Sequence, residues 1–142
     1  MSITRSFTGA LSLLSVACHQ SPVDSHNGRV VGTIDAGGTL DQVIEAPSTA
    51  PVGQSFSITV STFGNSCVSP AGAEVVVDGL VATITPYDVV VAGEICLDYL
   101  KAYPRTLQLH FGQAGTATIR VNGRSFYQAG TVSTERSLVV SQ

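Results

Sequence analysis

The side chains in this sequence that could do chemistry are three cysteines, three histidines and ten acidic residues. His19 and His26 lie in a polar stretch, and His110 lies on the outward face of an alternating segment, so they do not have the spacing of a metal site. Oxygen donors that would suit calcium occur only at irregular spacing, at Asp35, Asp88, Glu94 and Asp98. The sequence contains no metalloprotease, phosphate-loop, EF-hand or serine-hydrolase motif. We therefore predict no catalytic residue, no metal site and no cofactor, and a protein that is not an enzyme.

The first 18 residues have the layout of a secretory signal. They read MSITRSFTGALSLLSVAC, with one positive charge at Arg5, an apolar stretch over residues 7–17 and small residues at Ser15 and Ala17. The apolar stretch of about 11 residues is shorter than the roughly 20 that a membrane-spanning helix needs. We expect residues 1–17 to be a signal peptide that is removed on export, and the mature protein to have no transmembrane helix.

The end of this segment, Leu14-Ser15-Val16-Ala17-Cys18, resembles the lipobox of bacterial lipoproteins. The resemblance implies that Cys18 is acylated and anchors the protein in the bacterial cell envelope, so that it meets the membrane through lipid only. Ser15 stands where that family prefers leucine, and ordinary cleavage after Ala17 would instead leave Cys18 as the free thiol of a periplasmic or secreted protein. Residues 18–28 are polar and contain proline and glycine, as expected of a flexible tether or a frayed terminus.

The composition indicates one β-rich domain in residues 29–142. The chain has 142 residues, of which 44% are hydrophobic and only 12% are charged, about half of the usual ~25% share of charged residues. It is rich in glycine and in residues that favour strands and turns. The formal net charge is −3 and the basic residues are scattered, so we expect no nucleic-acid partner.

A hairpin is predicted in residues 73–84. Two apolar segments flank Asp78-Gly79, a dipeptide typical of two-residue hairpin turns. Such a turn would place Val77 opposite Leu80 and Val75 opposite Ala82, so that the inward pairs are apolar.

Other strands are predicted where apolar and polar residues alternate, in residues 55–61, 106–111 and 116–121. A four-residue hairpin at residues 112–115 would set an inward residue against an outward one, so we predict an arch that crosses between two sheets. Asn122-Gly123 predicts a further tight turn, which leads to residues 125–127. Residues 137–140 are expected to form a last edge strand.

About seven to nine short strands with frequent turns predict an all-β, two-sheet sandwich. The segments that begin at Pro51 (PVGQSFSITVSTFG) and Gly115 (GTATIRVNG) resemble strands of bacterial immunoglobulin-like domains. The resemblance implies an immunoglobulin-like β-sandwich over residues 29–142, without the tryptophan and the strand-to-strand disulfide of that family. Such domains serve as adhesins, spacers, protease inhibitors and accessory modules of enzymes, so the fold alone does not define a function.

A disulfide is predicted between the two remaining cysteines. With Cys18 assigned to lipid through the lipobox resemblance, Cys67 and Cys96 are left to pair. Counting strand reversals places the predicted loops 63–72 and 87–104 at the same end of the sandwich. The bond would close about 30 residues and contribute roughly 3 to 4 kcal/mol to stability by the chain-entropy relation.

The predicted loop 87–104 is long and holds three of the four tyrosines of the chain. The candidate binding residues of the two loops are Phe63, Tyr87, Ile95, Leu97, Tyr99, Leu100 and Tyr103. Tyrosine is favoured on recognition surfaces, but the same side chains could instead fold the loop onto the end of the core. Exposed aromatic side chains beside the cysteines would favour binding, and buried ones a structural role.

We therefore expect a non-catalytic binding or adhesion module of the cell envelope, whose partner is an unknown protein or envelope component. The alternatives are a structural or spacer domain of an envelope assembly, or a protease-inhibitor-like module or enzyme.

Overall fold

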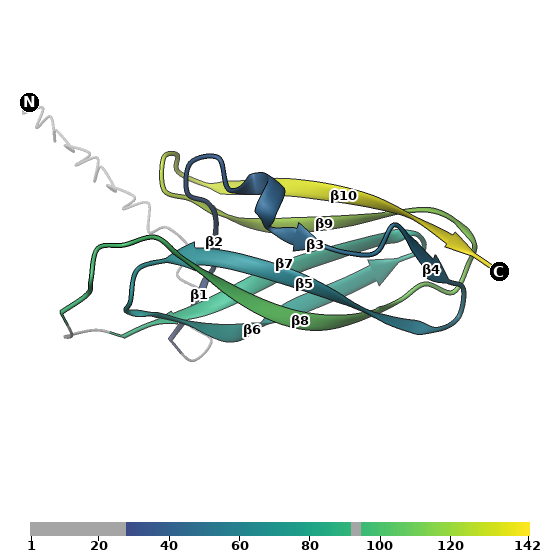
Figure 1. The fold of residues 1–142 in the computed structure, drawn as a ribbon, viewed down its shortest axis with the longest axis horizontal. Helices are drawn as coiled ribbons and strands as arrows, with labels where there is room; N and C mark the ends of the chain where they lie inside the picture. Colours follow the sequence, from purple (N-terminus) through teal and green to yellow (C-terminus); the bar gives the residue numbers. More distant parts are fainter. Residues whose placement is uncertain (1–27, 92–94) are drawn as a thin grey trace, which may run out of the picture.

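The computed structural model describes residues 28–91 and 95–142, which form two β-sheets packed face to face (Figure 1). The predicted fold class, an all-β two-sheet sandwich, is confirmed. The predictions of a signal peptide in residues 1–17, of lipid on Cys18 and of a tether up to residue 27 lie outside the described residues.

The larger sheet has seven strands and the smaller sheet has three. The larger sheet contains β1 (Arg29–Val31), β2 (Thr33–Asp35), β4 (Thr49–Pro51), β6 (Val68–Asp78), β7 (Val81–Val90), β9 (Gly115–Ser125) and β10 (Thr131–Ser141). The smaller sheet contains β3 (Ile44–Glu45), β5 (Ser55–Gly64) and β8 (Lys101–His110), and a short 3-10 helix, η1 (Leu40–Gln42), precedes β3. Six of these strands have 10 or 11 residues, so they are longer than the sequence pattern predicts.

The strand order places β6 at one edge of the larger sheet, followed by β7, β9, β10 and β4. β1 pairs with the C-terminal end of β7 and β2 with the C-terminal end of β9, while the N-terminal end of β7 pairs directly with the middle of β9. In the smaller sheet β5 lies between β3 and β8. Because β8 and β9 belong to different sheets, residues 111–114 cross from one sheet to the other, and the predicted arch is confirmed.

The core lies between the sheets and consists of the inward residues of the alternating strands. Its largest fully buried side chains include Ile34, Val43, Val60, Ile84, Leu109, Phe111, Ile119, Val121 and Val140. Phe111 comes directly after β8, and its ring packs against that of Phe56 with the ring centres 5.9 Å apart. The alternation of apolar and polar residues therefore identifies the face of each strand that is buried in the core.

The predicted hairpin forms, but its register is wrong by two residues. Asp78 pairs with Val81 and Val77 with Ala82, so the turn consists of Gly79 and Leu80. Gly79 has φ +57°, the left-handed conformation that glycine adopts readily. The Leu80 carbonyl accepts a hydrogen bond from the Thr118 N–H of β9, which keeps Leu80 in the turn and out of the ladder.

The predicted turn at Asn122-Gly123 is wrong, because β9 continues to Ser125 and the turn lies in residues 126–130. A Cβ on Gly123 would lie 2.6 Å from Ile34 Cγ2 and 2.9 Å from the Gly32 carbonyl oxygen. The glycine is therefore explained by the close approach of β2 and not by a turn.

The predicted last edge strand is also corrected, since β10 begins at Thr131 and its C-terminal end is covered by β4.

The two predicted loops are shorter than the sequence suggests. β5 extends to Gly64 and β6 begins at Val68, which leaves a turn of residues 65–67. β7 extends to Val90 and β8 begins at Lys101, which leaves a connection of residues 91–100. Tyr87 and Tyr103 thus lie on strands, because strand pairing continues beyond the segments in which alternation is evident.

Candidate functional site

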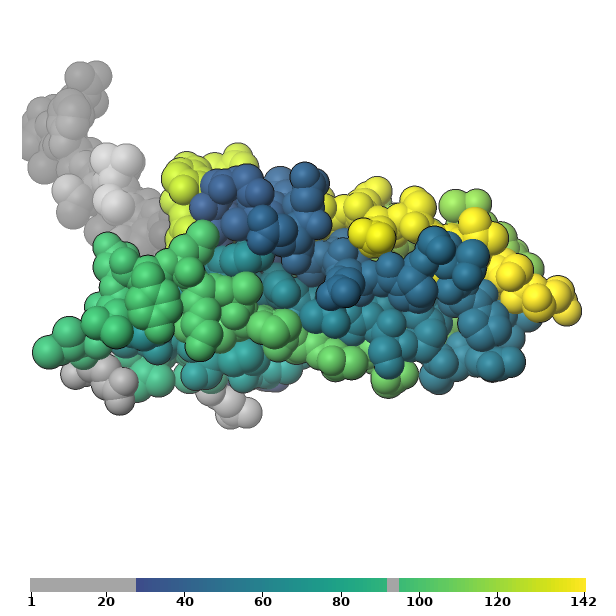
Figure 2. All heavy atoms as spheres, viewed as in Figure 1, coloured from purple at the N-terminus to yellow at the C-terminus, as the bar shows by residue number. Residues whose placement is uncertain are grey.

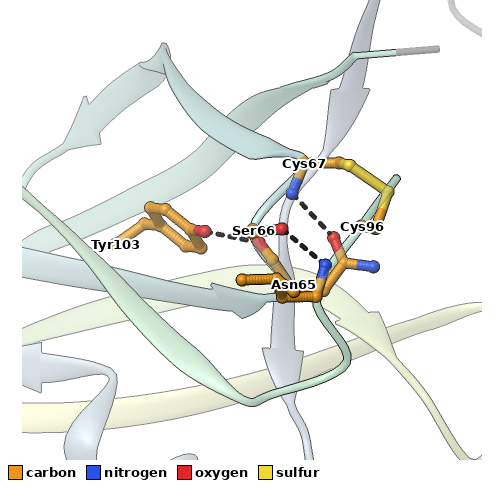
Figure 3. Close-up of a disulfide and its surroundings, with 6 residues drawn as sticks. Asn65, Ser66, Cys67, Cys96 and Tyr103 are labelled. Carbon is orange, nitrogen blue, oxygen red and sulfur yellow. Dashed lines mark hydrogen bonds between the residues drawn. A yellow bond between two sulfur atoms is a disulfide. The ribbon is translucent and has the colours of Figure 1, made fainter. Parts of the chain in front are cut away.

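The predicted disulfide between Cys67 and Cys96 is present, with Cα atoms 5.3 Å apart (Figure 3). It joins the turn between β5 and β6 to the connection between β7 and β8, at the same end of the sandwich as predicted. Ser66 Oγ accepts a hydrogen bond of 2.7 Å from the Leu97 N–H, and Asn65 Oδ1 accepts one of 3.0 Å from the Cys67 N–H. The Tyr103 hydroxyl donates to the Asn65 carbonyl. This end of the molecule is therefore held by one covalent bond and several hydrogen bonds.

Large apolar side chains are exposed around the disulfide. They come from the end of β7, from the connection to β8 and from the turn between β9 and β10. We call this set the apolar tip, and it consists of Val90, Val91, Ile95, Leu97, Tyr99, Leu100 and Phe126. Ile95 is 94% exposed and Leu97 is 60% exposed. In Figure 2 the green side chains of the β7–β8 connection form the left-hand end of the molecule, below the yellow-green β9–β10 turn.

A groove of about 440 Å³ opens beside the apolar tip. Its walls come from both sheets and include Phe63, Val68, Asp88, Tyr99, Arg124 and Phe126. Mostly apolar walls with a few charged groups are typical of sites that bind an apolar ligand group in a defined orientation.

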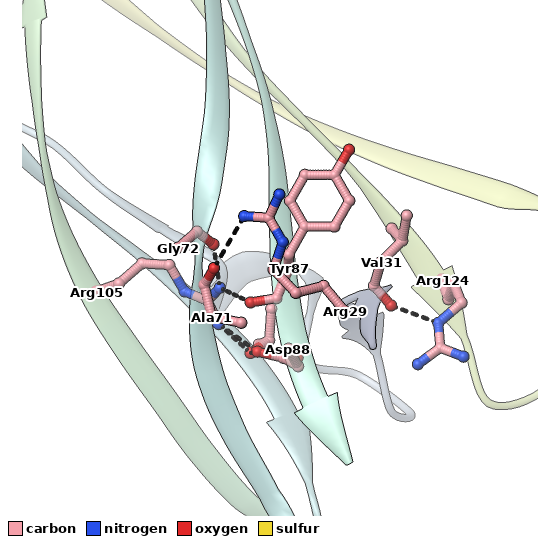
Figure 4. A network of polar contacts seen from close by, with 9 residues as sticks. Arg29, Val31, Ala71, Gly72, Tyr87, Asp88, Arg105 and Arg124 are labelled. Carbon is pink, nitrogen blue, oxygen red and sulfur yellow. Dashed lines mark hydrogen bonds and ion pairs between the residues drawn. The ribbon is translucent and has the colours of Figure 1, made fainter. Parts of the chain in front are cut away.

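A buried polar network includes Asp88 of the groove wall and joins the two sheets (Figure 4). Arg105 Nη2 lies 2.7 Å from Asp88 Oδ1 and donates to Thr62 Oγ1, and the Thr62 hydroxyl donates to Asp88 Oδ1. Arg105 Nη1 donates to the Gly72 and Tyr87 carbonyls at 2.8 and 2.7 Å. Because the Asp88 charge is paired with Arg105, removal of either side chain would leave the other charge buried and unpaired.

A second arginine packs on the other side of β7. Arg29 lies over the Tyr87 ring, with its guanidinium carbon 5.1 Å from the ring centre, and its Nη1 donates to the Ala71 carbonyl. The Tyr87 hydroxyl donates to Glu74 Oε2 at 3.4 Å. Tyr87 is half-buried, and these contacts account for its position on the strand without a ligand.

The predicted binding residues separate into two groups. Ile95, Leu97, Tyr99 and Leu100 are exposed, whereas Phe63 and Tyr103 are buried and Tyr87 is half-buried. Sequence reasoning missed Phe126 and Tyr127, which lie in a turn and not in a strand. It also missed the pairing of Arg105 with Asp88, which are 17 residues apart. The one sequence feature that could have indicated Phe126 and Tyr127 is that two aromatic residues are adjacent there.

The environment of Tyr103 changes the pKa of its hydroxyl. Burial raises the pKa of Tyr103 above its ordinary value of 10.0, and Tyr99 and Asp88 raise it further. The folded state therefore favours the neutral hydroxyl, which donates to the Asn65 carbonyl.

Of the oxygen donors considered for calcium, Asp35 and Asp88 are engaged within the protein, Asp98 is exposed and lines the groove, and Glu94 lies outside the described residues. Asp35 accepts from the Gly37 N–H and from the Ser125 hydroxyl, and Asp88 pairs with Arg105. Within residues 28–91 and 95–142, no three His, Cys, Asp or Glu side chains gather closely enough to hold a metal ion.

Comparison with protein-family models, with curated proteins and with solved structures finds no match for the chain. None of the helices in the described part of the chain is long and apolar enough to cross a membrane.

Proposed function

We propose that this protein is an exported, lipid-anchored binding module of the bacterial cell envelope with no catalytic role. In this proposal the apolar tip and the adjoining groove contact an envelope component. The single observation that carries the proposal is the exposure of Ile95, Leu97, Tyr99 and Leu100 beside the Cys67–Cys96 bond. Clusters of exposed apolar side chains are typical of surfaces that contact a partner.

The compartment is supported by the disulfide and by the N-terminal sequence. Disulfides are typical of proteins that fold outside the reducing cytoplasm. The signal-like segment and the lipobox-like residues before Cys18 support export and acylation.

A structural or spacer domain is the second candidate, and the burial of Phe63 and Tyr103 favours it. These two side chains close the end of the sandwich, as the structural alternative expects. The exposed residues of the tip have no such role, since they contribute little to the core.

Capture of membrane components from the envelope of the source organism tests the proposal. We expect Tyr99→Ser combined with Leu100→Ser to reduce recovery at least about tenfold, because burial of each side chain is worth about 1.5 to 3 kcal/mol. Val139→Ser is the matched control, since Val139 is 48% exposed and Tyr99 is 47% exposed. Unchanged recovery, with a lower melting temperature of the tip variant, would support the structural alternative instead.

A further inference from the structure

We infer that the apolar tip lies in the interfacial region of the lipid bilayer to which the protein is anchored. The inference rests on the proposed anchoring through Cys18, and it names the envelope component that the tip contacts as the membrane surface itself. Four features of the molecule support it: the point where the tether joins, the length of the tether, the chemistry of the tip and the fixed backbone beneath it.

The tether joins the domain at the end that carries the tip. Arg29, the first residue of β1, pairs with Val89, directly before Val90 of the tip. The C-terminus lies at the opposite end of the sandwich, where Val140 pairs with Gly115 (Figure 1). An anchor that precedes β1 therefore holds the tip, and not the far end, closest to the membrane.

The length of the predicted tether keeps the tip near the bilayer. Residues 19–28 separate Cys18 from β1. For the flexible tether that the sequence predicts, the root-mean-square end-to-end distance would be about 15 to 20 Å. Such a linker gives the tip an effective concentration of about millimolar at the membrane surface. The tethered tip therefore contacts the membrane even if its affinity is too low for an untethered domain to bind.

The side chains of the tip suit the interfacial region of a bilayer. Ile95, Leu97 and Leu100 supply exposed aliphatic groups, and Tyr99 supplies an aromatic group with a polar end. Tyrosine is enriched where membranes meet water, and apolar side chains enter the acyl region.

The charged groups around the tip favour lipid phosphates. Lys101 begins β8, with its Nζ 5.3 Å from the centre of the Tyr103 ring, and Arg124 lines the groove. The carboxylates that face the same groove are Asp88, which is paired with Arg105, and Asp98. Basic groups next to an apolar surface are attracted to phosphate headgroups.

The backbone beneath the tip has internal hydrogen-bond partners. The Leu97 N–H donates to Ser66 Oγ, the Tyr99 N–H to the Leu97 carbonyl and the Val91 N–H to the Cys67 carbonyl. Backbone groups with partners inside the protein lose less on leaving water than free ones would. The disulfide fixes these segments in place, which lowers the ordering entropy lost on contact.

Tryptophan fluorescence tests the inference, because the chain contains no tryptophan. Full-length protein with Leu97→Trp or Val139→Trp is purified from membranes and reconstituted in vesicles of phosphatidylethanolamine and phosphatidylglycerol. We expect the Leu97→Trp emission to shift to the blue relative to Val139→Trp and to be quenched when the vesicles contain brominated lipids. The control at the far end should show neither effect, and matching circular dichroism spectra and melting temperatures verify that both variants fold.

The inference would be overturned if, in lipidated protein, the Leu97→Trp variant has the same emission maximum as Val139→Trp and brominated lipids do not quench it. If Leu97 then crosslinks to an envelope protein, the proposed binding function stands and only the lipid partner is wrong. If mass spectrometry finds no acyl chains on Cys18, the proposed anchoring and this inference both fail.

Discussion

Arg105 Nη2 lies 2.7 Å from Asp88 Oδ1, and this ion pair connects β8 of the smaller sheet to β7 of the larger sheet. Both side chains are almost fully buried, with 7% and 3% of their surface exposed. Asp88 also lines the groove next to the apolar tip. The same contact therefore holds the sheets together and forms part of the candidate site.

Arg105→Met should lower the free energy of unfolding by about 3 to 5 kcal/mol, because it leaves the Asp88 charge buried and unpaired. Chemical denaturation measures the loss. Arg120→Met is the control: Arg120 Nε lies 2.6 Å from Glu135 Oε1, but both side chains are about half exposed, so the expected loss is about 1 kcal/mol or less. Equal losses in the two variants would show that burial does not determine the strength of the pair.

Replacing both Cys67 and Cys96 with alanine should destabilise the protein by roughly 3 to 4 kcal/mol, since the bond spans 29 residues. Thermal and chemical unfolding, with and without reductant, measure the effect. Reductant should destabilise the natural protein and leave the double variant unchanged. A variant as stable as the natural protein would mean that the hydrogen bonds of Ser66 and Asn65 alone hold this end.

Gly123→Ala should cost about 1 to 3 kcal/mol, because the new methyl group would overlap Ile34 and the backbone of Gly32. Gly112→Ala is the matched control, since a Cβ at that position meets no atom within 4 Å and the glycine has no positive φ. Urea denaturation of both variants gives the comparison. A tolerated Gly123→Ala would contradict the close packing of β2 against β9.

The ionisation of Tyr103 should be visible as a late step in the tyrosine titration, above the ordinary tyrosine pKa of 10.0. Burial raises its pKa above 10.0, so the folded state favours the neutral hydroxyl. The stability that this provides is present below about pH 10 and is lost as the pH rises through the raised pKa of the folded state. Ultraviolet absorbance of tyrosinate measures the titration, and Tyr103→Phe should remove the late step. If the Tyr103→Phe variant keeps the late step, the assignment of that step to Tyr103 is contradicted.

The fold was predictable from local patterns where one face of a strand is buried. Alternation in residues 55–61, 106–111 and 116–121 identifies the strands, and the mismatch at residues 112–115 identifies the crossing between sheets. The errors arise where a tertiary contact decides the local structure. Gly123 accommodates β2, and the Leu80 carbonyl bonds to β9, so neither position behaves as its dipeptide predicts.

The candidate site was predictable only in part. The cysteine count and strand directions place Cys67 and Cys96 at the same end, and the apolar residues on either side of Cys96 mark the exposed connection. The burial of Tyr103 depends on its hydrogen bond to Asn65, which is 38 residues away. Phe126 reaches the groove because β9 runs parallel to β7, a pairing that no local sequence signal specifies.

The most direct test of the binding end is photocrosslinking in living cells of the source organism. A benzophenone amino acid at Leu97, in the apolar tip, is compared with one at Val139, at the opposite end of the sandwich. We predict covalent adducts to envelope lipid or protein from position 97, and few from position 139. Adducts from position 139 alone, or in equal amounts from both positions, would contradict the assignment of the disulfide-joined end as the binding surface.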